Sequence, residues 1–108
     1  MSIKRITAIM PVQMLDPLEE DLRRCGVPGV TVEHVRGYGV HPNFFRRDLM
    51  RQNVRLVLYS AEDRVETILE ALTSCAKRHG VQSGIVAVES IERLVMLGQG
   101  ADVDPAEL

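Results

Sequence analysis

Alternating apolar and polar positions predict a strand near the start of the chain. Ile6, Ala8 and Met10 alternate with Arg5, Thr7 and Ile9, a period of two that is typical of a strand with one face more buried than the other. We therefore expect a first strand over Ile3 to Met10. Three further runs rich in β-branched and apolar residues are expected to be strands, over Val30 to Arg36, Val54 to Tyr59 and Ile85 to Val88.

Between these runs, apolar residues recur at helical spacing in two segments. The first helix is expected to begin at the N-cap Asp16, followed by Pro17, and to end before Gly26. The second is expected to begin at the cap Ser60 and to end before Gly80, with cations in its last turn. The buried stripes are expected to be Leu18, Leu22 and Cys25 in the first helix, and Val65, Ile68, Leu69, Leu72 and Cys75 in the second.

The order of elements, β-α-β-β-α-β, predicts an α+β ferredoxin-like sandwich. It has a four-stranded antiparallel sheet with both helices on one face. The open face would carry Thr7, Ile9, Val35 and Val57 rather than uniform charge, so we expect a homo-oligomer to cover it. Residues 1–97 form the domain, with an effector loop over 40–53, and residues 98–108 form a polar C-terminal tail. Ile91 to Leu97 is a short fifth strand or a helical turn, and we place Met10 and Met96 in the core.

Composition limits the class of protein. The chain has 108 residues, a net charge of −2, 45% hydrophobic and 26% charged positions. These values fit one folded domain and argue against disorder, against a general nucleic-acid binder and against a membrane span, which needs about 20 apolar residues. No secretory signal is visible, so the cytoplasm is the expected location. Cys25 and Cys75 are expected to be reduced and packed.

Positive charge is concentrated in one segment of the chain. Between Arg36 and Arg55 there are five arginines and one acid, a local charge of +4 that leaves −6 for the remainder. Arginine binds phosphate and carboxylate groups through its planar fork, and Phe44 and Phe45 add an apolar contact. The segment predicts binding of an anion or a partner protein, with an ordinary solvated loop as the alternative. The candidate anion residues are His41, Arg46, Arg47 and Arg51.

Two glycine-containing segments accompany this loop. Gly37-Tyr38-Gly39 lies at its entrance, and Arg78-His79-Gly80-Val81-Gln82-Ser83-Gly84 follows the second predicted helix. Glycines serve tight turns more often than ligands, but bare amides and fixed cations together are what a polyphosphate requires.

The phrases Lys4-Arg5-Ile6-Thr7-Ala8-Ile9 and Gly26-Val27-Pro28-Gly29-Val30-Thr31-Val32-Glu33-His34-Val35-Arg36-Gly37-Tyr38-Gly39 resemble the PII signalling proteins. The likeness covers most of the chain and is weaker after Val81. The resemblance implies a homotrimer of ferredoxin-like subunits, nucleotides bound in the clefts between subunits, and a loop that holds a target protein.

The resemblance also implies roles by position. The base and ribose would contact Ile9, Gly29, Val30, Thr31, Leu58 and Tyr59, and the phosphates Gly37, Tyr38, Gly39 and Val40. The neighbouring subunit would supply Arg78, His79, Gly80 and Gly84, and also Arg93 as the first arginine of a C-terminal Arg-x-Arg pair. The second arginine is replaced by Val95, which implies that ADP or AMP binds at least as well as ATP. No cofactor other than such a ligand is expected.

The loop differs from that of the nitrogen sensors in the family. His41 and Asn53 stand where those proteins use a glutamine and a lysine for magnesium and 2-oxoglutarate. The stretch Ser83-Gly84-Ile85-Val86-Ala87-Val88 resembles the members linked to inorganic-carbon uptake and carboxysomes, which implies bicarbonate as a co-effector. The target would be a transporter or an enzyme bound through residues 40–53. The alternatives are a nitrogen-type regulator that senses 2-oxoglutarate and an interaction module that needs no nucleotide.

Other families with this topology use functional residues that this chain lacks. The loop Pro11-Val12-Gln13-Met14 lacks the phosphate-binding arginine of acylphosphatases. There is no CxxC pair, and His34, His41 and His79 are scattered, so no metal site is expected. Aromatic residues make up 4% of the chain, too few for RNA stacking. No nucleophile-base set is recognisable, so we expect a sensor rather than an enzyme.

Overall fold

The computed structural model describes residues 2–37 and 51–108. The predicted order of the main elements is confirmed: the described residues run β-α-β-β-α-β and then add a short hairpin. Their bounds are β1 Ile3–Pro11, α1 Leu15–Arg24, β2 Thr31–Gly37, β3 Arg51–Ala61, α2 Val65–Arg78, β4 Ile85–Ile91, β5 Val95–Met96 and β6 Ala101–Asp102.

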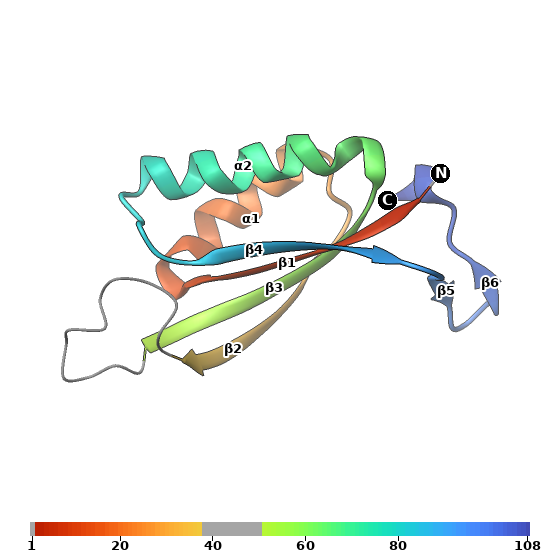
Figure 1. Ribbon diagram of the computed structural model, residues 1–108, viewed down its shortest axis with the longest axis horizontal. Coiled ribbons are helices and arrows are strands. Elements are labelled where there is room, and N and C mark those ends of the chain that lie inside the picture. Colours follow the sequence, from red (N-terminus) through yellow and green to blue (C-terminus); the bar gives the residue numbers. More distant parts are fainter. Residues whose placement is uncertain (1, 38–50) are drawn as a thin grey trace.

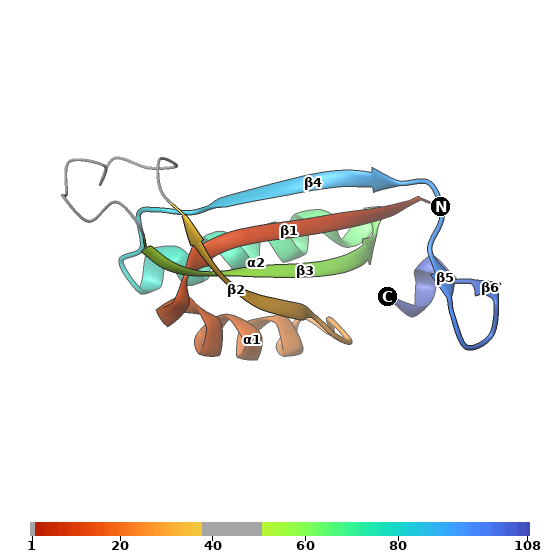
Figure 2. The same ribbon diagram turned by 90° about the horizontal axis from the view of Figure 1, so that it is seen from below.

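The sheet has four antiparallel strands in the order β2-β3-β1-β4. The central strand β1 pairs with β3 from Ile3↔Ala61 to Pro11↔Asn53, and with β4 from Ile3↔Ile91 to Ile9↔Ile85. Both helices lie on one face of this sheet (Figures 1 and 2). The fold is therefore the ferredoxin-like α+β sandwich that the sequence predicts.

The core lies between the helices and the sheet. Leu18 and Leu22 of α1 and Ile68, Leu72 and Cys75 of α2 are at most 3% exposed. They pack against the alternate strand positions that include Ile6, Ala8, Met10, Val54, Leu56 and Leu58. Burying each large aliphatic side chain contributes about 1.5–3 kcal/mol, so the predicted stripes supply most of the driving force that holds the helices on the sheet. Cys25, predicted on the same stripe, is only half-buried, and both cysteines are free thiols.

Both helices begin differently from the prediction. A 3-10 turn over Val12–Met14 continues directly into α1, so Asp16 lies inside the first turn and is not the N-cap. Ser60 is also wrong as a cap, because β3 continues through it and its hydroxyl donates to the Ala61 carbonyl at 2.8 Å. A 3-10 turn over Glu62–Arg64 then leads into α2. The two strands thus enter their helices through 3-10 turns without side-chain caps.

The predicted helix ends are confirmed. Gly26 follows α1 with φ +81° and Gly80 follows α2 with φ +65°, the left-handed conformation that glycine adopts without strain. Lys77 and Arg78 occupy the last turn of α2.

The C-terminal segment is folded back on itself. Within Ile91 to Leu97, expected as a short strand or a helical turn, Val95–Met96 form β5, which pairs with β6. The segment ends in a 3-10 turn over Pro105–Glu107. Arg64 ties this end to the body: its guanidinium donates to the Leu108 carbonyl at 2.9 Å and to the Cys25 carbonyl. Met96 is 52% exposed, so its placement in the core is wrong, whereas Met10 is buried as predicted.

Candidate functional site

The open face of the sheet brings several predicted site residues together. Strand register aligns Thr31 with Val57 and Thr7, and places Tyr59 opposite Arg5. These side chains share the face away from the helices, because directly paired residues point to the same side of a sheet. They surround a shallow hollow of about 460 Å³.

Two ion pairs border this hollow. Arg5 Nη2 lies 2.9 Å from Glu89 Oε1, and Arg55 pairs with Glu33. The hydrogen bond with Glu89 and its negative charge raise the pKa of Arg5, and Tyr59 adds a smaller contribution. The hollow therefore combines apolar and aromatic side chains with paired charges. The sequence alone does not indicate these pairs, because each joins residues of different strands.

Leu58 does not belong to this group. It is 1% exposed and lies in the core beneath the helices, whereas its neighbours Val57 and Tyr59 lie on the open face. The alternation of Val54, Leu56 and Leu58 with Arg55 was the signal that identifies the buried face. Gly29 and Val30 border a different hollow, between α1 and the start of β2.

A second group of predicted residues meets where β1 ends and β4 begins. Gly84 has φ +114°, and a Cβ at this position would lie 2.7 Å from the Ile9 carbonyl oxygen. Only glycine fits such a close approach of two backbones. Ile9 and Gly84 of the same chain are therefore neighbours.

The same end of the sheet carries the end of β2 and the start of β3, where Gly37 pairs with Arg51. The connection from α2 to β4 also lies at this end (Figure 1). Arg78 at the end of α2 pairs with Asp21 of α1, which raises the pKa of the guanidinium. His79 is exposed, and its Nδ1 lies 2.9 Å from the Cys75 carbonyl oxygen. Arg78 thus already has an acidic partner on α1. Tyr38, Gly39, Val40, His41, Arg46 and Arg47 lie outside the described residues.

Arg93 is at the other end of the molecule, beyond the last residue of β4. Its Nε and Nη2 donate to Asp102 Oδ1 at 3.1 and 3.0 Å. The seven residues of β4 separate Gly84 from Arg93, a span of about 20 Å at 3.3 Å per residue. One chain cannot bring both residues to the same phosphate group.

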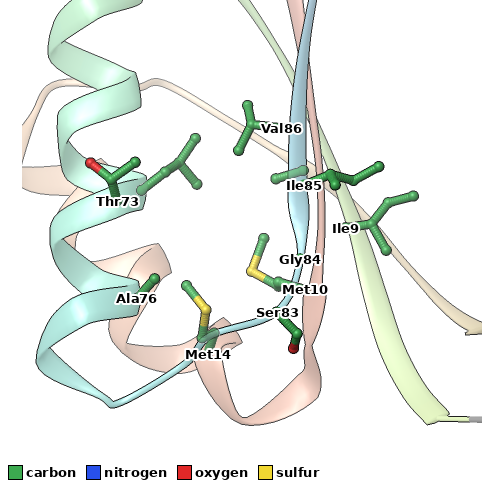
Figure 3. Close-up of a pocket in the computed structure, with 11 residues that line it drawn as sticks. Ile9, Met10, Met14, Thr73, Ala76, Ser83, Gly84, Ile85 and Val86 are labelled. Carbon is green, nitrogen blue, oxygen red and sulfur yellow. The ribbon is translucent and has the colours of Figure 1, made fainter. Parts of the chain in front are cut away.

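The edge strand β4 is exposed along almost its whole length. Ile85, Val86 and Val88 are between 39% and 47% exposed, and no described residue pairs with the outer edge of β4. An apolar cavity of about 320 Å³ opens between this strand and α2. Figure 3 shows Met10 and Met14 in the gap between the helix and the strand. Edge strands of this kind are normally covered or paired.

The described part of the chain offers little for other chemistries. It holds no cluster of three or more side chains suited to a metal ion. Burial raises the pKa of the Cys75 thiol, and the nearby Asp21 carboxylate adds to this, so this thiol is a poor nucleophile. No helix within residues 2–37 and 51–108 has the length and apolar character of a membrane span.

The fold and the two separated groups of residues define a small ferredoxin-like protein whose exposed edge and open face suit assembly with other chains. The family model for nitrogen regulatory protein P-II matches residues 3–100, and the chain belongs to this family. It is 27% identical to the nitrogen regulatory protein P-II of Cereibacter sphaeroides over 91% of this chain and 94% of that protein. It is 28% identical to the protein of the same name from Mesorhizobium japonicum, with the same coverage. It is 26% identical to nitrogen regulatory protein P-II 1 of Escherichia coli (strain K12), over 96% of this chain and 99% of that protein. The family assignment made from the sequence is confirmed, and the chain is a PII-type signalling protein.

Proposed function

We propose that this PII-type protein is a non-enzymatic sensor that binds an adenine nucleotide (ADP, AMP or ATP) in clefts between the subunits of a homotrimer. The binding state would be transmitted through residues 40–53 to a target protein, a transporter or an enzyme. The main support is the separation of the two groups of candidate ligand residues. Ile9, Gly37 and Gly84 lie at one end of the sheet and Arg93 at the other, so a cleft that uses all of them needs two chains.

The exposed surfaces support assembly into a closed ring. The edges β2 and β4 lie on opposite sides of the sheet. An association that joins one edge region to the opposite edge region of the next chain is head-to-tail, and it closes into a ring when the rotation permits. Such a ring would cover Ile85, Val86 and Val88 and the open face. In a ring of three chains there are three such clefts. Each cleft takes the group with Ile9, Gly37 and Gly84 from one chain and Arg93 from the adjoining chain.

Each group has a distinct chemical contribution to a nucleotide. At Gly84 the absence of a side chain lets a phosphate approach the backbone, and Gly37 is suited to the same role. Arg93 of the adjoining chain would supply positive charge. Ile9, Thr31 and Tyr59, which share the open face, would contact the base and the ribose. Because Val95 stands in place of a second arginine, the γ-phosphate would have one positively charged partner fewer. ADP and AMP are therefore expected to compete well with ATP.

The arginines of residues 40–53 provide the proposed link to a target. Arg46, Arg47 and Arg51 could bind a small oxyanion such as bicarbonate next to the nucleotide phosphate. Coupling between these ligands would change the loop that the target recognises.

The proposal is tested first by calorimetric titration with ADP, AMP and ATP, alone and in bicarbonate, with the molar mass measured by light scattering. We expect three chains per particle, about one nucleotide per chain, and tighter binding with bicarbonate. A parallel titration with 2-oxoglutarate tests the nitrogen-type alternative suggested by the names of the relatives. If the protein is a trimer that binds none of the nucleotides, the proposal is overturned. An interaction module that needs no nucleotide is then the remaining alternative.

A complementation experiment tests the composite cleft directly. The Ile9→Asp change damages one group of residues and Arg93→Ala the other, and each variant alone should bind ADP at least ten-fold more weakly. Mixed trimers assembled from both variants regain some intact clefts and should recover a corresponding fraction of tight sites. Arg24→Ala serves as the charge-matched control, because Arg24 is exposed on α1 and, among the described residues, pairs with Glu20 and Asp21 of its own helix. If mixing restores no tight site, the cleft is not shared between chains.

A further inference from the structure

The short hairpin that follows β4 places a carboxylate directly on Arg93. Val95 pairs with Asp102, and Val103 N donates to the Leu94 carbonyl at 2.8 Å. Gly100 N donates to the Met96 carbonyl at 2.8 Å and closes the turn. Backbone hydrogen bonds therefore hold Asp102 beside the segment that carries Arg93. This placement does not depend on a chance side-chain encounter.

The contact uses the part of the guanidinium that is best suited to an oxyanion. Nε and Nη2 of Arg93 both donate to one oxygen, Asp102 Oδ1, at 3.1 and 3.0 Å. Arginine binds phosphate through the same kind of paired donors. A phosphate oxygen and Asp102 Oδ1 cannot occupy this position together.

The pair is also weak enough to be displaced. Both side chains are largely exposed, Arg93 at 71% and Asp102 at 66%, and water screens exposed ion pairs strongly. A nucleotide phosphate carries more charge than one carboxylate and can therefore replace it at a small cost.

We infer that Asp102 is a built-in competitor for the phosphate position at Arg93 and lowers the affinity of the ligand-free protein for its nucleotide. The inference rests on the proposed function, which places Arg93 in the nucleotide cleft. Competition is reciprocal: a bound phosphate releases Asp102 and loosens the β5–β6 hairpin. The stability of the hairpin thus depends on the bound ligand.

The variant Asp102→Asn tests the competition, because asparagine has nearly the same shape without the negative charge. ADP should bind about two- to five-fold more tightly, the range that corresponds to losing an exposed ion pair. Adenosine, which has no phosphate, should bind with unchanged affinity. Glu20→Gln is the control for net charge, since Glu20 pairs with Arg24 on α1, and it should leave both affinities unchanged.

Two further measurements separate competition from a general electrostatic effect. In an Arg93→Ala background, Asp102→Asn should no longer change ADP affinity. Hydrogen exchange of the amides from Val95 to Asp102 should become faster when ADP is added to the wild type, and adenosine should not have this effect.

The outcomes distinguish the inference from the proposed function. If the wild type binds ADP and Asp102→Asn binds it equally well, the inference is wrong and the proposed function stands. An equal gain with Glu20→Gln also overturns the inference, because net charge would then explain the result. If neither the wild type nor Asp102→Asn binds any adenine nucleotide, the proposed function fails and the inference fails with it.

Discussion

Replacing Gly84 by alanine is expected to destabilise the protein strongly, and the structure gives the size of the effect. Gly84 has φ +114°, a backbone region that residues with a Cβ rarely enter, at a cost of about 1–3 kcal/mol. The added methyl would also lie 2.7 Å from the Ile9 carbonyl oxygen. Because both groups belong to backbone, strands β1 and β4 must move apart, and overpacking of this kind costs about 1–3 kcal/mol. We expect a total loss of about 2–6 kcal/mol.

The effect is measured by urea unfolding at one fixed protein concentration, because assembly would make the apparent stability depend on concentration. With a urea dependence of about 1.5–2 kcal/mol per M for a domain of this size, the midpoint should fall by about 1–4 M. The loss should appear in circular dichroism and in amide exchange of the β1–β4 pairs nearest Gly84.

Two other glycines of the chain are matched controls. Gly80 has φ +65° with no atom within 4 Å of an added Cβ, so Gly80→Ala should cost only the left-handed strain, about 1–2 kcal/mol. Gly29 has no positive φ and open space around it, so Gly29→Ala should lie within about 0.5 kcal/mol of the wild type. If Gly84→Ala is no more destabilising than Gly80→Ala, the close approach of β1 and β4 does not constrain the fold and the reasoning is refuted.

Three other substitutions or treatments have defined outcomes. Leu72→Ala removes a side chain that is 3% exposed and should cost about 2–5 kcal/mol in urea unfolding; a cost under 1 kcal/mol would contradict the packing described. Arg64→Ala removes the hydrogen bonds to Leu108 and Cys25, so carboxypeptidase should digest the C-terminal segment faster than in the wild type; an unchanged rate would show that other contacts hold this end. A thiol reagent should label Cys25 in the native protein and Cys75 only after unfolding, since Cys75 is 0% exposed. Equal labelling of both thiols would refute this burial. Burial raises the pKa of the Cys75 thiol, so the free energy of unfolding should fall as the pH rises above about 8.5, where the unfolded thiol ionises first, and the urea midpoint should show this fall.

Much of the fold could be predicted because local patterns and tertiary packing agree in this chain. The stripe of Ile68, Leu72 and Cys75 identifies the buried face of α2, and Gly26 and Gly80 mark the helix ends. The starts were missed because Asp16 and Ser60 are good caps in isolation. The long strands β1 and β3 instead continue directly into 3-10 turns. As a result Asp16 lies inside α1 and Ser60 inside β3, so neither stands at the N-cap position.

The candidate site was harder to predict because it depends on which residues face each other across strands. A sequence places Leu58 and Tyr59 together, although a strand turns them to opposite sides of the sheet. It places Ile9 and Gly84 far apart, although strand register makes them neighbours. The pairing of Arg93 with Asp102 depends on a hairpin whose strands have two residues each. Strands this short have no recognisable alternation of apolar and polar residues.

The position of β1 at the centre of the sheet determines when the fold can form. The first strand of the chain pairs with β3, where Ile3 meets Ala61, and with β4, where Ile3 meets Ile91. A ribosome must therefore synthesise about half of the 108 residues before either partner of β1 exists, and about 30 residues more before the second pairing can begin. Such distant contacts slow folding, because long loops must close before the contacts form. During synthesis β1 has two unsatisfied edges, and chaperones that bind extended apolar segments have their longest opportunity there.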